Sequence, residues 1–199
     1  LILMATLRDH GASWIIALVP YLCYARKDRR TKPHDPVTTR YVAQLFEAIG
    51  CDHIITFGIH NPAAFENAFR CQSTLVDLGA VFQDVMAWRI DDASLMVMSP
   101  DPGGVKRAQL FREVLEERLG HPISFGFMNK RRRGGIMTSG DVVGDFQDKA
   151  VLIVDDMIAS GGTMVAAARQ CRRMDARNVY AVAAHGLFTG KAEALFAND

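Results

Sequence analysis

Short apolar runs alternate along the chain with longer segments in which apolar residues repeat at helical spacing. The runs themselves show no period, which is typical of strands buried on both faces of a parallel sheet. They lie at residues 14–19, 53–57, 95–98, 123–127, 150–154 and 179–184. Because predicted strands and helices follow one another in turn, the pattern predicts an α/β fold with right-handed crossovers and mostly parallel sheets.

Three of the predicted helices have recognisable ends. The first begins with Asp35 as its N-cap and Pro36 in its first turn, and Gly50 ends it. The second covers residues 105–119 before Gly120, and the third follows Gly162. The positions expected to face the core are Val42, Leu45, Phe46 and Ile49 in the first helix, Leu110, Val114 and Leu115 in the second, and Met164, Val165, Ala168 and Cys171 in the third.

A domain boundary is expected near residues 78–81, where a strand-like stretch at residues 73–78 gives way to a new helical pattern. It divides the chain into residues 1–78 and 79–199, two α/β lobes that are each small for their class. The chain also starts at Leu1 within an apolar stretch and ends at Asp199, soon after a helical pattern begins at residue 191. We therefore expect a fragment of a longer protein, with both lobes incomplete.

Composition excludes several classes of protein. Hydrophobic residues make up 49% and charged residues 23% of the 199 positions, and the net charge is +1. These values exclude a disordered chain and give no general preference for nucleic acid or membranes, so neither is an expected partner. The longest apolar run, residues 14–24, is too short for a bilayer, which needs about 20 residues. Four cysteines without metal-site spacing favour a reducing compartment, and a cytoplasmic enzyme is expected.

The most specific motif is VLIVDDMIASGGT at residues 151–163. A buried strand ends in Asp155 and Asp156, and Ser160, Gly161, Gly162 and Thr163 lead into a helix. Glycine amides, hydroxyls and a helix N-terminus favour a phosphate group, whereas adjacent acids accept hydrogen bonds from sugar hydroxyls. The motif therefore predicts a sugar-phosphate site at the carboxyl end of a strand. A capped helix beside two solvated acids is the simpler interpretation, but it does not explain why both acids end the strand.

A second strand ends in SPDPGGVKRA at residues 99–108. Its glycines can open a phosphate-binding turn, and Asp101 could hold Mg²⁺ directly or through water. Turns of this composition are common, so the motif is only moderately specific by itself. Residues His60 and His185 each follow a predicted strand, and His60 is the better candidate for a metal or phosphate contact.

Two basic segments also follow predicted strands. They are YARKDRRT at residues 24–31 and NKRRRGG at residues 129–135. The first can meet a polyphosphate, and the second has the composition of a loop that closes over phosphates. Each could instead be a solvated basic loop, and a nucleic-acid patch is disfavoured by the near-neutral charge and the lack of interleaved aromatic residues.

In this order, the four loops resemble those of the ribose-phosphate pyrophosphokinases, over nearly the whole chain up to HGLF at residues 185–188. The loop at residues 155–163 is shared with phosphoribosyltransferases in general, whereas YARKDRR together with SPDPGGVKRA is typical of the pyrophosphokinases. The resemblance implies two tandem phosphoribosyltransferase-like (type I) domains and a homo-oligomer, a hexamer or a dimer. It also implies Mg²⁺-dependent transfer of diphosphate from ATP to O1 of ribose 5-phosphate.

The resemblance also assigns roles to individual residues. It places Lys130 and Arg132 in the catalytic loop and His60 and Asp101 at Mg²⁺. ATP would be bound by Arg26, Lys27 and Asp28. Ribose 5-phosphate would be bound by Asp155, Asp156, Ser160, Gly161, Gly162 and Thr163.

Four positions depart from the family pattern. Lys27 stands where Gln is usual, Gly58 and Ala159 where Asp is frequent, and Gly161 where Cys is frequent. These departures indicate a divergent branch and bear on nucleotide and Mg²⁺ binding. Two alternatives therefore stay open: a phosphoribosyltransferase, and a non-catalytic regulatory homologue of the synthetase.

Overall fold

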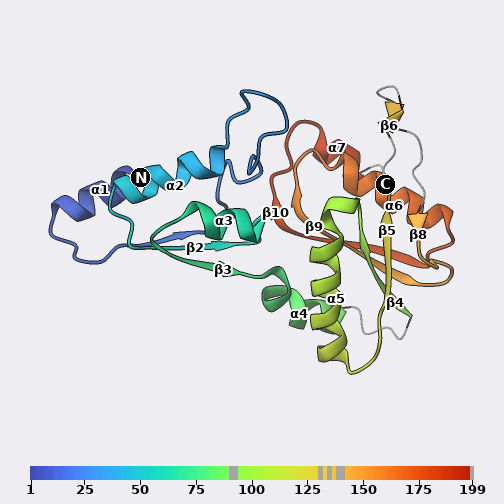
Figure 1. Ribbon diagram of the computed structural model, residues 1–199. Coiled ribbons are helices and arrows are strands. Elements are labelled where there is room, and N and C mark those ends of the chain that lie inside the picture. Colours follow the sequence, from blue (N-terminus) through green and yellow to red (C-terminus); the bar gives the residue numbers. More distant parts are fainter. Residues whose placement is uncertain (90–93, 130–131, 134–135, 138–141, 198–199) are drawn as a thin grey trace. The chain divides into compact units, whose positions relative to one another are not determined.

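The computed structural model describes residues 1–89, 94–129, 132–133, 136–137 and 142–197. The chain forms two compact units, Leu1–Asp77 and Leu78–Asp199 (Figure 1). Each unit contains a sheet that is wholly or mostly parallel, with helices packed on it, so the α/β fold expected from the sequence is confirmed.

The first unit holds a three-stranded parallel sheet in the order β1-β2-β3. Its elements are α1 (Ile2–Asp9), β1 (Ile16–Val19), α2 (Thr38–Ala48), β2 (His53–Phe57), α3 (Pro62–Ala68) and β3 (Gln72–Val76). Ala17 of β1 pairs with Ile54 of β2, and both side chains are buried. The neighbouring β1 residues Ile16 and Leu18 point to the opposite face and are 54% and 71% exposed.

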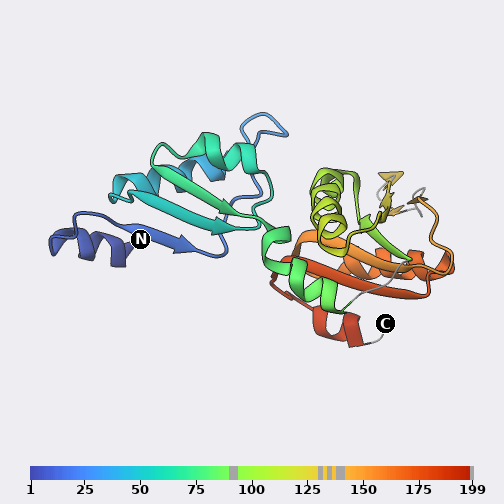
Figure 2. The ribbon, with the colours of Figure 1, turned by 90° about the horizontal axis from the view of Figure 1, so that it is seen from below.

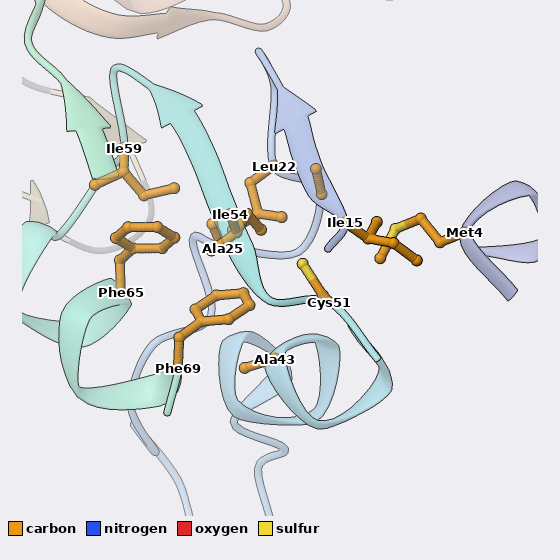
Figure 3. Close-up of a cluster of buried hydrophobic side chains, with 11 residues drawn as sticks. Met4, Ile15, Leu22, Ala25, Ala43, Cys51, Ile54, Ile59, Phe65 and Phe69 are labelled. Carbon is orange, nitrogen blue, oxygen red and sulfur yellow. The ribbon is translucent and has the colours of Figure 1, made fainter. Parts of the chain in front are cut away.

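Helices α2 and α3 supply the core of this unit. Figure 3 shows Phe65 of α3, Phe69 directly after α3 and Ala43 of α2 directed toward Ile54 on β2. The two phenylalanine rings lie 5.1 Å apart between centroids. Both helices therefore cover the face of the sheet to which Ile54 points.

The second unit holds a five-stranded sheet in the order β10-β9-β4-β5-β8, in which only the β5–β8 pairing is antiparallel. Its strands are β4 (Leu95–Ser99), β5 (Ser124–Met128), β8 (Val142–Val143), β9 (Ala150–Ile158) and β10 (Asn178–Gly186), and a separate hairpin pairs β6 (Arg132–Arg133) with β7 (Ile136–Met137). Its helices are α4 (Leu78–Arg89), a 3₁₀ turn at Pro102–Gly104, α5 (Val105–Leu119), α6 (Gly162–Arg173) and α7 (Ala192–Ala197).

The central strands of this sheet are buried on both faces. Every residue of β4 is buried, as are the first five of β9. Val151 and Ile153 pack with Met164 and Cys171 of α6 on one side, and α5 covers the other side (Figures 1 and 2). Near-continuous apolar strands are what a parallel sheet covered by two helix layers requires.

The predicted strands of both units are confirmed to within a few residues at their ends, and α5 has the predicted bounds and ends at Gly120 in the left-handed conformation. The predicted start of α2 is wrong, because the helix begins at Thr38 after Val37. Asp35 does not cap it, since its carboxylate accepts hydrogen bonds from the Thr31 and Lys32 amides instead. Leu45 and Leu110 were expected inside, but they are exposed, and Ala43 and Phe111 take the buried positions.

The four cysteines are free thiols, and Cys51, Cys71 and Cys171 lie wholly or partly inside their units. Burial raises the pKa of the Cys71 thiol to about 11 and that of Cys171 to about 12. These thiols are therefore protonated at neutral pH and behave as small apolar side chains. In the part of the chain that the structure describes, we find no helix of the length and hydropathy that a bilayer crossing needs.

Candidate functional site

The carboxyl ends of β4 and β9 meet at one edge of the second sheet. The strands are parallel neighbours, and Met98 of β4 pairs with Ile153 of β9. The next residues along each strand, Ser99 and then Asp101 on one side and Asp155 and Asp156 on the other, therefore lie at the same edge. Ligands of open α/β sheets bind at this edge, outside the carboxyl ends of the strands.

Arg107 joins the two acids of β9. It lies in the first turn of α5, with its Nη1 atom 3.1 Å from Oδ1 of Asp155 and its Nη2 atom 3.6 Å from Oδ2 of Asp156. All three side chains are largely buried, with exposed fractions of 18% for Arg107, 15% for Asp155 and 7% for Asp156. The guanidinium group of arginine suits this geometry, because its two terminal nitrogens can each contact one carboxylate and hold both in fixed orientations.

Asp155 is an unusual acid. Burial, together with the hydrogen bond and charge of Asp156 beside it, raises its pKa to about 7, although Arg107 opposes this shift. Its Oδ1 atom also accepts a hydrogen bond of 2.8 Å from the Asp156 amide. Near neutral pH, this carboxyl group is therefore poised between its neutral and ionised forms.

The turn after β4 is held by its own polar groups. The Asp101 carboxylate accepts a hydrogen bond of 3.1 Å from the Gly104 amide and so caps the 3₁₀ turn. The buried Ser99 hydroxyl donates to the Asp101 carbonyl over 2.6 Å. A Cβ atom on Gly104 would lie 2.8 Å from the Ser99 oxygen, so this tight turn requires glycine. The turn brings α5, and with it Arg107, to the end of β9.

The loop between β9 and α6, which we call the cradle, leads into the start of a helix and has the composition expected of a phosphate-binding loop. Gly161 precedes the helix in the left-handed conformation, with φ of +80°, which glycine adopts without strain. Gly162 begins α6, Ser160 is exposed, and Thr163 lies half-buried in the first turn. The start of a helix of 12 residues presents amide donors and a favourable dipole to an anion.

Helix α7 packs against this loop through one aromatic side chain. The Phe196 ring packs on Gly161, where a Cβ atom would lie only 2.6 Å from the ring. Phe196 also meets Phe188 edge-on, with 5.9 Å between centroids. The loop is tied to the chain after β10 as well, since the Thr189 amide donates to the Ala159 carbonyl over 2.9 Å.

The first unit brings together other predicted residues at the carboxyl end of its own sheet. Asn61, which follows His60 after β2, donates from Nδ2 to Oδ2 of Asp28 over 2.6 Å. The same Asn61 side chain caps α3 by accepting from the Ala64 amide. The basic segment after β1 therefore folds back to the end of β2, and Asp28 lies near His60.

Lys27 is engaged within its own loop. Its ammonium group pairs with the Asp35 carboxylate and donates to the Thr31 hydroxyl over 3.1 Å. The carbonyl of Lys27 accepts hydrogen bonds from Thr38 and Thr39 at the start of α2. Arg26 is exposed. Of the three predicted ATP-binding residues, Arg26 thus presents its charge to solvent, whereas Lys27 and Asp28 form contacts within the unit.

The structure divides the predicted site residues between the units. Arg26, Lys27, Asp28 and His60 lie in the first unit, and Asp101 and the residues from Asp155 to Thr163 lie in the second. In the second unit, Arg132 lies on β6, whereas Lys130 lies outside the described residues. Among the residues that are described, no three His, Cys, Asp or Glu side chains form a cluster that could hold a metal ion.

Sequence reasoning missed Arg107. Its partners lie 48 and 49 positions away in the sequence, so the motif at residues 99–108 does not by itself reveal its role. A local signal was nonetheless present: Arg107 follows the Gly103–Gly104 pair and occupies the first helical turn. This placement directs a long side chain across the carboxyl end of the neighbouring strand.

Comparison with known proteins gives matches over nearly the whole chain. Residues 1–50 match the family model described as the N-terminal domain of ribose phosphate pyrophosphokinase, and residues 129–199 match the phosphoribosyl synthetase-associated domain. The ribose-phosphate pyrophosphokinase of Ureaplasma parvum is 33% identical over 98% of this chain and 58% of its own length. That of Mycoplasma pneumoniae is 36% identical, with the same two coverages.

A solved structure agrees with these matches. The phosphoribosylpyrophosphate synthetase of Mycobacterium smegmatis has a TM-score of 0.87 to this chain at 28% identity, covering 98% of this chain and 62% of its own. The chain spans somewhat more than half the length of these relatives. Over the residues that it spans, the chain belongs to the ribose-phosphate pyrophosphokinase family.

Proposed function

We propose that the protein is a ribose-phosphate diphosphokinase, which transfers diphosphate from ATP to O1 of ribose 5-phosphate and releases AMP. The sequence predicted that the strand ends in Asp155 and Asp156, but β9 runs on to Ile158, because its pairing with β10 continues to that residue. The observation that carries this proposal is the presence of these two acids in the carboxyl half of β9, followed by a glycine-containing loop at the start of α6. The acids can accept hydrogen bonds from sugar hydroxyls, and the amides after the strand can bind phosphate, so the two groups suit the two ends of a sugar phosphate.

In this proposal Asp155 and Asp156 accept hydrogen bonds from the ribose hydroxyls. The amides and hydroxyls of residues 160–163 bind the 5-phosphate. Arg26, Lys27 and Asp28 contribute to the ATP site. Lys27 either exchanges its contact with Asp35 for a phosphate group or keeps that contact and so shapes the loop. Lys130 and Arg132 neutralise charge on the transferred group, because phosphoryl transfers depend mostly on positioning and charge stabilisation.

Mg²⁺ belongs to the proposal as a cofactor, with His60 and Asp101 as its expected contacts. The Asp101 carboxylate suits a metal bound chiefly through ATP, because Mg²⁺ usually keeps several waters and takes one or two carboxylates together with phosphate oxygens, whereas the His60 nitrogen is a less favoured donor for this ion. A cage of three protein ligands is therefore not required. When bound, the ion would supply charge neutralisation on the phosphate oxygens.

A homo-oligomer, as a hexamer or a dimer, and a cytoplasmic location are further parts of this proposal. They rest on the resemblance to the family and on the reducing environment that the cysteine pattern favours. The near-neutral net charge supports small-molecule substrates over nucleic acid.

The proposal is tested by measuring AMP release from ATP and Mg²⁺, with and without ribose 5-phosphate. The assay uses the 199-residue chain and, in parallel, the protein encoded by its complete reading frame. We expect AMP formation that depends on ribose 5-phosphate, and its loss in Lys130→Ala by two orders of magnitude or more, roughly the effect of removing one transition-state contact. Arg118→Ala is the matched control, because it also removes one positive charge but does so at an exposed ion pair of α5. This variant should keep activity.

The outcomes separate the alternatives. A complete protein that forms no AMP, but consumes phosphoribosyl pyrophosphate with a base and releases diphosphate, would be a phosphoribosyltransferase. A complete protein with neither activity, which alters the activity of an added synthetase, would be a regulatory homologue. Either result would overturn the proposed reaction.

A further inference from the structure

We infer that Arg107 is a positioning residue that determines specificity for the ribose diol over the corresponding 2-deoxy sugar. The inference rests on the proposed function, because it concerns the sugar end of the proposed ribose 5-phosphate site. It assigns a role to a residue outside the predicted binding set, and its basis is the arrangement of Arg107 between the two acids of β9.

The carboxyl plane of Asp155 is fixed by two donors on one oxygen. Its Oδ1 atom accepts from Nη1 of Arg107 over 3.1 Å and from the Asp156 amide over 2.8 Å. With one oxygen held in this way, the direction of the other oxygen follows. On the other side of the guanidinium, Nη2 lies 3.6 Å from Oδ2 of Asp156, so the same group also restrains the second acid.

A vicinal diol requires this kind of fixed pair. Two neighbouring hydroxyls point in related directions, so two acceptors must hold a set spacing and angle to receive both hydrogen bonds. Carboxylates that turn freely would lose side-chain entropy on binding and would accept one hydroxyl almost as well as two. Restraint by Arg107 before the sugar binds removes most of that cost.

Charge leads to the same conclusion. Two adjacent buried acids repel each other, and burial with the charge of Asp156 already raises the pKa of Asp155 to about 7. Arg107 is the cation that offsets this repulsion. Asp101 is the N-cap of the 3₁₀ turn before α5, and His185 lies on β10 two positions beyond the partner of Asp155. A neutral residue at position 107 would favour a state in which the two acids share one proton. In that state they would be weaker acceptors for two hydroxyls.

The phosphate end of the site does not depend on Arg107. The residues that form the cradle are at positions 160–163, and they are held by α6, by the Phe196 contact and by the Thr189–Ala159 hydrogen bond. Loss of Arg107 should therefore change recognition of the sugar hydroxyls while the affinity for the phosphate group stays nearly constant.

The test compares the dissociation constants of ribose 5-phosphate and 2-deoxyribose 5-phosphate by titration calorimetry. The titrations are made with Mg²⁺, in the absence and in the presence of an ATP analogue that cannot transfer diphosphate. The variants are Arg107→Gln, Arg107→Lys and the matched control Arg118→Gln on the same helix. All are measured in the protein from the complete reading frame and in the 199-residue chain.

The wild type should prefer ribose 5-phosphate by about ten- to a hundred-fold, the range for a hydrogen bond to a charged group. Arg107→Gln should reduce this preference to about threefold or less while changing the affinity for the 2-deoxy sugar by no more than about threefold. Arg107→Lys should restore part of the preference, because it returns the charge but not the two-pronged geometry. Arg118→Gln should match the wild type.

Two results would overturn the inference. An unchanged preference in Arg107→Gln would show that Arg107 does not set specificity, and an equal loss of affinity for both sugars would show that it only supports the fold. A wild type that binds neither sugar, with or without the analogue, would instead remove the proposed function, and this result is distinct from the other two.

Discussion

The charged clusters of the two units differ in how far apart their members lie along the chain. In the first unit, Lys27 and Asp35 are eight positions apart, and the pair closes a loop that is partly open to solvent. In the second unit, Arg107 and Asp155 are 48 positions apart and largely buried. The first cluster can form from local chain alone, whereas the second exists only when β4, α5 and β9 have packed together.

The sheets show the same contrast. Strands β4 and β9 have apolar residues buried on both faces, but β1 has only one buried residue, Ala17, between the exposed Ile16 and Leu18. Burial on both faces gives the second sheet more apolar contact per residue and a more rigid edge. We therefore expect the acids of β9 to be held more rigidly within the second unit than the loop between Lys27 and Asp35 is held within the first.

The largest effect should come from the buried strand β9. Leu152→Ala removes a side chain with no exposed surface and should lower the free energy of unfolding by about 2–5 kcal/mol, through lost burial and a residual cavity. Leu18→Ala on β1 removes the same atoms from a side chain that is 71% exposed and should cost less than about 0.5 kcal/mol. Urea denaturation followed by circular dichroism measures both, and similar costs at the two positions would contradict the contrast.

A smaller effect is expected at the cradle. Gly161→Ala places a side chain at φ of +80° and drives a Cβ atom to 2.6 Å from Phe196. The backbone strain costs about 1–2 kcal/mol, and displacement of the ring adds to it. Gly190→Ala is the matched control, because Gly190 also has positive φ, at +68°, but nothing lies within 4 Å of the added atom. The difference in thermal stability between the variants measures the Phe196 contact, and equal losses would show that the contact contributes nothing.

The pH dependence of stability should identify Asp155. Its folded pKa of about 7 lies above the value of 3.8 for an unperturbed Asp, so the folded state holds the proton more tightly. The contribution of Asp155 to the free energy of unfolding is therefore fully present below about pH 4, and it is lost as the pH rises through about 7. Asp155→Asn should reduce the resulting decline in stability, by about 2–3 kcal/mol between pH 5 and 8, as measured by thermal unfolding. The exposed Asp84→Asn should leave the decline in place, and a steeper decline in Asp155→Asn would contradict the assignment.

The smallest effect should come from the local cluster of the first unit. Hydrogen bonds from Lys27 and Thr31 hold the pKa of Asp35 well below its usual range. The stabilisation from this carboxylate is thus present above about pH 4 and is lost as pH falls further. Asp35→Ala should remove the exchange protection of the Thr31 and Lys32 amides, whereas Lys27→Ala should remove only part of it. Hydrogen exchange by NMR measures this, and unchanged protection in Asp35→Ala would refute the role of Asp35.

Prediction from the sequence succeeded where the signal is local. The strands were found from uninterrupted apolar runs, and α5 was found because Gly120 ends it. The start of α2 was missed, because Asp35 can cap a helix or close a loop and the choice depends on Lys27. Leu110 was placed inside because it lies at helical spacing from Val114, but the stripe that meets the sheet is rotated by one residue and passes through Phe111 and Leu115.

The candidate site was predictable only in part, for the same reason. The acids and glycines of residues 155–163 follow one another in the sequence, so their chemistry could be recognised there. Arg107 depends on the order of strands in the sheet, which places β4 beside β9. The roles of Lys130 and Arg132 stay predictions, since Lys130 lies outside the described residues.

Because Phe196 of α7 contacts Gly161, the stability of α7 should depend on whether the loop at residues 159–163 is occupied. A helix of six residues is too short to be stable alone, so α7 exists because its side chains are anchored in the unit. By thermodynamic linkage, whatever stabilises the loop at residues 159–163 also stabilises the helix that rests on it. Amide exchange in α7 should therefore slow when an anion fills the cradle, which would allow occupancy of the site to be followed without any enzymatic turnover.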